Sequence, residues 1–336
     1  MLYFATAALV ALIIVNGMTD APNAITCAVV TEALPLKKAA TLAGLFNLIG
    51  CLLSVTVGGG VAYFTFSLTS FADYTDSSAA LVALTMGILS VVIWSFLAWY
   101  LGIPTSESHG MLASVSGACC AFAIRHGIHL SDALNLKGWI GVAIGFLVST
   151  IPPYVFSRFF SLVNSSRHRC GDRGKPSNSN RRDALCRYGQ ITCAMLNAFL
   201  HGAQDGQKFI GIAMTVIALS GLDGDFTITA VAVPVAVLIS IGTLLGGKRI
   251  IEHTGKDLVT LNTAQGFCAD LTSSFFLGVC LVAGLPVSTT HAKTCAIMGA
   301  GKNLNRSVCR QLVIAWIATL PICFCLGFAL SYIALS

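Results

Sequence analysis

The sequence predicts an all-α polytopic membrane protein with about ten to twelve transmembrane helices, arranged as two inverted repeats with interrupted helices. Three observations lead to this class. Of the 336 residues, 55% are hydrophobic and only 10% are charged, whereas about a quarter of the residues of a soluble protein are charged. Apolar segments of about 20 residues recur along the chain. Two polar motifs inside these segments occur once in each half of the chain.

Ten apolar segments account for most of the chain. They lack the ten-residue alternation of a β-barrel, so we expect helices. The first segment is too long, and too polar near its middle, for a cleaved signal peptide. The 13 cysteines lie mostly singly in apolar runs and are expected to be small buried hydrophobic residues. The predicted spans are 2–33, 39–60, 79–101, 106–124, 138–160, 189–219, 227–247, 264–284, 286–301 and 311–335.

The distribution of Lys and Arg predicts the orientation. If the N-terminus lies outside, most of the 20 basic residues fall in cytoplasmic loops, and the outer loops keep only Arg125 and Lys137. We therefore expect a multi-pass protein of the cell membrane with both termini outside. The net charge of +6 then reflects topology, and we do not expect nucleic-acid binding.

One polar and basic stretch, SSRHRCGDRGKPSNSNRRD at 165–183, divides the chain into halves of similar size. Its composition predicts a flexible cytoplasmic loop. The predicted organisation is a first transmembrane repeat at 1–160, a cytoplasmic basic linker at 161–188 and a second repeat at 189–336.

Both halves carry the same pair of motifs. NGMTDAPNAI (16–25) and HGAQDGQKFIGI (201–212) each contain Gly-x-x-Asp, and roughly 80 residues later each half has Pro-x-Ser-x-x-His, at 104–109 and 286–291. The repeated order and spacing indicate an internal duplication. With five spans per half, the second half would insert upside down relative to the first.

The first motif predicts a cation site. An ionised Asp at the centre of a lipid-facing helix costs about 3 kcal/mol or more. Gly17 and Pro22 flank Asp20, so we expect an unwound break whose carbonyls, with the oxygens of Asp20 and Asn23, line a cavity. Such oxygens suit Na⁺, and a carboxylate there can carry H⁺. We expect Gln204 and Asp205 to do the same in the second half. The alternative is a buried polar pair that stabilises helix packing.

The second motif, PTSESH or PVSTTH, is typical of a helix start, because Pro favours the first turn and Ser caps the end. Free N–H groups and hydroxyls there can bind an anion, and two such ends would surround a tetrahedral oxyanion. Plain capping is the alternative.

Lys208 shares a helix face with Asp205, and is either its neutralising partner or a second charge for the anion.

Other features are less informative. Lys293 is expected to extend toward the membrane surface, and Asp270 is a weaker candidate for an ion site. The GxxxG motifs at 141–145 and 242–246 predict close helix packing.

These motifs, together with 246–274, resemble the duplicated signatures of the PiT family of inorganic phosphate transporters, in its prokaryotic form. The resemblance covers nearly the whole chain apart from the linker. It implies a secondary active transporter, not an enzyme, that moves inorganic phosphate in symport with Na⁺ or H⁺ and has no cofactor beyond the coupling ion. It assigns Asp20, Asn23 and Asp205 to the cation. It assigns to phosphate the hydroxyls of Thr105, Ser106, Ser108, Ser288, Thr289 and Thr290.

The sequence departs from the family pattern at three positions. Thr19 and Gln204 stand where the family usually has Asn, and Glu107 replaces a small residue. A carboxylate beside the anion site could carry a proton, so Glu107 is a candidate proton carrier. It could equally be a bystander.

Two alternative functions are considered for the same motifs. A sulfate permease of the same family, coupled to H⁺, shares these motifs; phosphate near neutral pH can donate a hydrogen bond to a carboxylate, whereas sulfate cannot. An intramembrane hydrolase built from Ser, His and Asp would need one nucleophile, but the motif is duplicated and no Gly-x-Ser-x-Gly elbow is present. The expected partners are phosphate, the coupling cation and the lipid bilayer. The sequence leaves a homodimer open.

Overall fold

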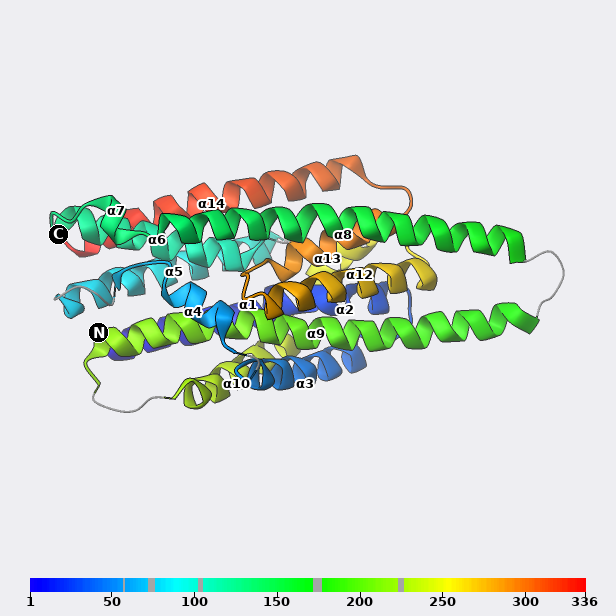
Figure 1. The fold of residues 1–336 in the computed structure, drawn as a ribbon, viewed down its shortest axis with the longest axis horizontal. Helices are drawn as coiled ribbons and strands as arrows, with labels where there is room; N and C mark the ends of the chain where they lie inside the picture. The colour runs from blue at the N-terminus through cyan, green and yellow to red at the C-terminus, as the bar shows by residue number, and fades with distance from the viewer. Residues whose placement is uncertain (57, 72–75, 102–104, 172–176, 223–226) are drawn as a thin grey trace.

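Long helices run along the molecule in the computed structural model (Figure 1). The structure describes residues 1–336 except 57, 72–75, 102–104, 172–176 and 223–226. Within these described residues no β-strand forms, and only isolated bridges join Thr69 to Leu134 and Thr260 to Lys302. The predicted all-α class is therefore confirmed.

The longest helices, α8 and α9, are consecutive in the chain, and several short helices form connections. The elements are α1 (Leu2–Thr19), α2 (Ala21–Val30), α3 (Leu36–Ser54), α4 (Gly60–Phe66), α5 (Ser77–Leu101), α6 (Glu107–Arg125), α7 (Leu130–Ala133), α8 (Leu136–Gly171), α9 (Ser177–Ser220), α10 (Ile228–Leu245), α11 (Lys248–Ile251), the π-helical turn η2 (Glu252–Asp257), α12 (Thr263–Val282), α13 (Thr289–Ala300) and α14 (Arg306–Ala334).

Two helix pairs fold back in the middle of the molecule instead of crossing it (Figure 1). α5 runs inward from the end that holds both termini, and α6 returns to that end. α12 runs inward from the opposite end, and α13 returns there. In each pair the two helices pack on each other. We call these pairs the α5–α6 hairpin and the α12–α13 hairpin.

The hairpins bear on the predicted number of spans. Among the described residues, seven helical segments are long and apolar enough to cross a membrane, and α6 and α13 are not among them. α13 has 12 residues, a length of about 18 Å against a hydrocarbon core of about 30 Å. The structure therefore does not confirm 106–124 and 286–301 as separate spans. Because each hairpin replaces two adjacent predicted spans, both termini still lie opposite the 161–188 region (Figure 1).

The predicted unwound break at Asp20 was also wrong. α1 ends at Thr19 and α2 begins at Ala21, and Asp20 itself keeps a right-handed helical backbone, with φ −92° and ψ −41°. Its N–H donates to the Asn16 carbonyl at 2.8 Å. Pro22 lies in the first turn of α2, where a missing N–H is tolerated. The 29 residues from Leu2 to Val30 therefore form one nearly continuous segment.

The second predicted break, at Gln204 and Asp205, does not occur. α9 continues through both residues, and no proline lies within it. Asp205 forms an ion pair with Lys208 on the same helix at 2.6 Å, and His201 Nε2 lies 3.2 Å from its carboxylate. Because the charge is compensated locally, the helix does not need to open.

The 161–188 region is more helical than predicted. α8 extends to Gly171 and α9 begins at Ser177, so the backbone continues the flanking helices through most of the stretch expected to be a flexible loop. Residues 172–176 of the predicted loop lie outside the described residues.

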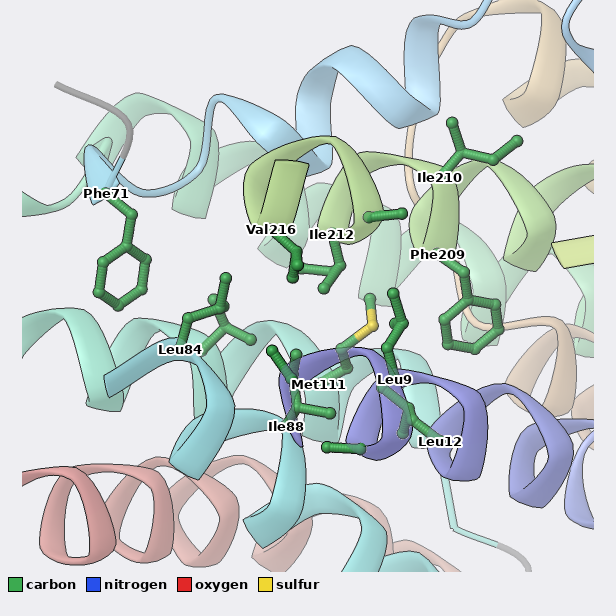
Figure 2. Close-up of a cluster of buried hydrophobic side chains, with 14 of the residues drawn as sticks. Leu9, Leu12, Phe71, Leu84, Ile88, Met111, Phe209, Ile210, Ile212 and Val216 are labelled. Atoms are coloured by element: carbon green, nitrogen blue, oxygen red, sulfur yellow. The ribbon is translucent and has the colours of Figure 1, made fainter. Parts of the chain in front are cut away.

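Apolar side chains from α1, α5, α6 and α9 fill the space between these helices (Figure 2). They include Leu12, Ile88, Met111 and Phe209, each at most 2% exposed. The described cysteines are free, and most are buried, as predicted.

Glycines let the second helix of each hairpin touch a neighbouring backbone. A Cβ atom at Gly117 of α6 would lie 2.1 Å from the Phe324 carbonyl oxygen of α14. A Cβ atom at Gly299 of α13 would lie 2.3 Å from the Tyr154 carbonyl oxygen of α8. Both distances are far inside van der Waals contact, so only glycine permits these crossings.

The close packing predicted at the two GxxxG motifs is confirmed. A Cβ atom at Gly145 would lie 2.3 Å from the Pro286 carbonyl oxygen, and one at Gly242 would lie 2.3 Å from the Ile14 carbonyl oxygen. The second contact joins α10 to α1 close to the Asp20 joint.

These contacts predict that replacing glycine by alanine has different effects on thermal stability in two adjacent helices, α13 and α12. Gly299→Ala should lower the melting temperature of the purified protein, because overpacking against backbone costs about 1–3 kcal/mol. Gly278→Ala on α12 is the matched control, because its Cβ would have no contact closer than 3.9 Å. Alanine's helix propensity should leave this control unchanged or more stable. Equal melting temperatures for the two variants would contradict the predicted crossing.

Candidate functional site

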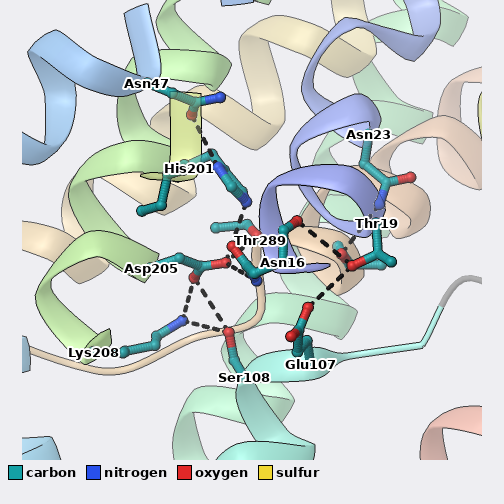
Figure 3. Close-up of polar contacts among 12 residues, drawn as sticks. Asn16, Thr19, Asn23, Asn47, Glu107, Ser108, His201, Asp205, Lys208 and Thr289 are labelled. Carbon is teal, nitrogen blue, oxygen red and sulfur yellow. Dashed lines mark hydrogen bonds and ion pairs between the residues drawn. The ribbon is translucent and has the colours of Figure 1, made fainter. Parts of the chain in front are cut away.

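The predicted site residues meet in the middle of the molecule, where the two hairpins reach α1, α2 and α9 (Figures 1 and 3). None of them is more than 6% exposed. The gathered residues are Asp20, Asn23, Thr105, Ser106, Glu107, Ser108, Gln204, Asp205, Lys208, Ser288, Thr289 and Thr290. Pro104, which begins the first Pro-x-Ser-x-x-His motif, lies outside the described residues.

Asp205 is the point where both hairpins meet α9 (Figure 3). Ser108, near the start of α6, donates its hydroxyl to Asp205 Oδ1 at 3.2 Å. Thr289, at the start of α13, donates its hydroxyl to Oδ2 at 3.5 Å. One carboxylate therefore connects two segments that are far apart in the sequence.

The Lys208 ammonium lies in the same cluster and has three oxygen partners. It donates to Asp205 Oδ1 at 2.6 Å, to Ser108 Oγ at 2.8 Å and to the Val287 carbonyl at 2.6 Å. An ammonium has three N–H donors, so all of them are used within the protein. This arrangement favours the neutralising role for Lys208 over that of a second charge for the anion.

On the Asp20 side of the site, several buried polar atoms lack hydrogen-bond partners within the described part of the chain. Thr19 donates to Glu107 Oε2 at 3.0 Å, and Asn23 Nδ2 donates to Thr290 Oγ1 at 3.1 Å. Yet Asp20 Oδ2, Asn23 Oδ1 and Glu107 Oε1 are buried and have no hydrogen-bond partner within the described part of the chain. Buried acceptors left this way cost free energy, so a cation or proton that bound there would stabilise the site.

The two hairpin starts are capped helix N-termini, as predicted. The Ser106 hydroxyl accepts the His109 N–H at 3.3 Å, and the Ser288 hydroxyl accepts the His291 N–H at 3.2 Å. The remaining N–H groups of each first turn have no partner within their own helix. Both helix dipoles therefore direct positive potential at the site.

The cavity at this site is small. A cavity of about 10 Å³ lies beside Asp20, Asn23, His201 and Thr289. That volume holds about one water molecule, which is also the scale of a bare cation. A tetrahedral oxyanion is larger than this cavity.

The expectation for Lys293 was wrong. Lys293 is 2% exposed, pairs with Asp270 and donates to the Ala24 carbonyl at 3.2 Å. A buried ammonium and carboxylate are mutually stabilising. Asp270, the weaker ion-site candidate, therefore already has a cation beside it.

Asn16 and His201 also belong to this site, although neither was predicted. Asn16 Nδ2 lies 3.3 Å from Asp205 Oδ2, and His201 Nε2 lies 3.2 Å from the same oxygen. His201 Nδ1 also bonds to Asn47 Oδ1 at 2.9 Å (Figure 3). The signal was available, because each residue directly precedes the glycine of its Gly-x-x-Asp motif.

Known proteins resemble this chain over nearly its whole length. A probable low-affinity inorganic phosphate transporter of Bacillus subtilis (strain 168) is 31% identical over 330 residues, covering 96% of this chain and 93% of the relative. The low-affinity inorganic phosphate transporter PitA of Escherichia coli (strain K12) is 22% identical, covering 96% and 94%.

A solved structure described as the sodium-dependent phosphate transporter has a similar fold. Its TM-score is 0.80 at 17% sequence identity, and the match covers 99% of this chain and 98% of that one. Residues 16–327 match the model of the phosphate transporter family. The chain therefore belongs to the phosphate transporter family.

Proposed function

We propose that this protein is a secondary active transporter that moves inorganic phosphate across the cell membrane in symport with Na⁺ or H⁺. The observation that carries the proposal is the convergence of two capped helix starts on two buried acidic motifs, through the contacts of Asp205 with Ser108 and Thr289. The relatives named above are phosphate transporters, and the solved neighbour is described as sodium-dependent. The family points to a transporter and not to an enzyme.

The proposed architecture is a pair of inverted repeats, 1–160 and 189–336, joined by the 161–188 linker. Helix packing supports it. α1 packs on α10 as α9 packs on α3, and α6 packs on α14 as α13 packs on α8. If α9, α10, α13 and α14 are the counterparts of α1, α3, α6 and α8, exchanging the two halves turns the first contact of each pair into the second. The two hairpins also enter from opposite ends of the molecule (Figure 1). On the positive-inside rule, the termini lie outside and the linker is cytoplasmic.

The proposed phosphate site lies between the two hairpin starts. Backbone N–H groups in the first turns of α6 and α13 would donate to the anion, and the helix dipoles would favour its charge. Hydroxyl groups of the two motifs would turn toward phosphate once the site opens. They belong to Thr105, Ser106, Ser108, Ser288, Thr289 and Thr290.

The proposed cation site uses the unsatisfied oxygens of Asp20 and Asn23, with Asp205 and Gln204 as their counterparts in the second half. Na⁺ fits such oxygens, whereas H⁺ would reside on Asp20 or Glu107. A bound cation would offset the carboxylate charge that otherwise repels phosphate in a buried, weakly screened site. This electrostatic link explains why the cation and the anion would move together.

Labelled phosphate uptake into liposomes that contain the purified protein tests the function. An imposed Na⁺ or pH gradient should drive uptake, and Asp20→Asn should reduce it at least about tenfold, because a charged contact in the site is lost. Asp76→Asn is the matched control, because that carboxylate is exposed and pairs with His126 outside the site. Faster entry of labelled sulfate than of phosphate would show that the site serves a sulfate permease.

Glu107→Gln tests the proton carrier. If H⁺ resides on Glu107, this variant should lose at least about tenfold of its response to a pH gradient, because the amide cannot release a proton. Exchange of external for internal phosphate, which needs no net proton movement, should change by less than about threefold. A variant that still responds fully to the pH gradient would remove Glu107 from this role.

A further inference from the structure

The surroundings of the Lys208 ammonium have the composition of a small cation site. Its three partners are a carboxylate oxygen of Asp205, a hydroxyl oxygen of Ser108 and the carbonyl oxygen of Val287, at 2.6 to 2.8 Å. They come from α9, from α6 and from the segment before α13. These are the oxygen types that hard cations take as ligands. Lys208 is only 1% exposed, so the ammonium replaces solvent there completely.

Within the described residues no ammonium bonds to the Asp20 carboxylate, because Lys293, which lines the cavity beside Asp20, donates to the Ala24 carbonyl and pairs with Asp270 instead. Lys208 follows Asp205 by three residues, and Asn23 follows Asp20 by three. Each makes the equivalent contact with a hairpin hydroxyl: Lys208 Nζ donates to Ser108 at 2.8 Å, and Asn23 Nδ2 donates to Thr290 at 3.1 Å. Asn23 is neutral, and on its side buried oxygens are left without partners in the described part of the chain.

We propose that the Lys208 ammonium is a tethered substitute for a coupling cation, so that only the Asp20 motif needs an exchangeable one. The proposal rests on the proposed cation-coupled function and refines it. A covalently attached ammonium neutralises Asp205 throughout the transport cycle and never dissociates. If both motifs bound an exchangeable cation, each would contribute one cation per phosphate. With Lys208 in place of one of them, one cation fewer moves with each phosphate.

The proposal predicts that shortening Lys208 creates a sodium site. Lys208→Ala leaves space beside the three oxygens, whereas Lys208→Met fills most of it with a neutral chain. Replacement of choline by about 100 mM Na⁺ should raise the melting temperature of purified Lys208→Ala by about 3 °C more than that of Lys208→Met or the unaltered protein. Asp205→Asn/Lys208→Ala, which lacks the carboxylate, should lose this extra rise. Lys208→Ala and Lys208→Met remove the same charge, so any sodium effect at Asp20 is common to these two variants and cancels in their difference.

Equal sodium responses in Lys208→Ala and Lys208→Met would overturn the proposal. If Lys208→Ala does not stay folded in choline, its recovery in Na⁺ becomes the readout. Failure to recover in Na⁺, with Asp205→Asn/Lys208→Ala folded in both salts, would also overturn it. The measurement needs no transport, so a failure of phosphate uptake in the unaltered protein would refute the proposed function separately. In liposomes, phosphate uptake by Lys208→Ala should depend on Na⁺ more strongly than uptake by Lys208→Met, because a second sodium site is present only in Lys208→Ala.

Discussion

The fold depends on the burial of carboxylates inside a bundle of apolar helices. Asp205 and Asp270 are fully buried, and Asp20 and Glu107 are at most 3% exposed. Each charge needs a partner, because an unpaired buried ion costs several kcal/mol. Asp205 pairs with Lys208 on its own helix and accepts hydroxyl hydrogen bonds from both hairpins, whereas Asp270 pairs with Lys293 of α13. The positions of the hairpin starts therefore follow from where the charges lie.

Much of this site was predictable from the sequence, because its signals are local. A carboxylate inside an apolar segment must have a reason to be there, and Ser followed three residues later by His marked both capped helix starts. Duplication made each signal stronger. Asn16 and His201 lacked such a signal on their own, because an amide or an imidazole in a helix is common.

The incorrect predictions concerned features that tertiary contacts decide. Whether a helix opens around Asp205 depends on His201 and Lys208, which already compensate the charge. Whether an apolar segment crosses or turns back depends on what covers its polar face. α6 and α13 turn back because glycines such as Gly117 and Gly299 let them pack closely against α14 and α8. Hydropathy alone does not contain that information.

Asp205 also suggests how access could alternate on the proposed function. It bonds to Ser108 of the hairpin from the terminus end and to Thr289 of the hairpin from the linker end. The bond to Thr289 is the longer, at 3.5 Å against 3.2 Å, whereas Lys208 reinforces the Ser108 side and also reaches Val287. If one hairpin moves while the other keeps its bonds, the site opens to one end only. Since Lys208 bridges both hairpins, such a movement must break at least one of its contacts. Phosphate and the exchangeable cation would have to supply that free energy together, which is what coupling requires.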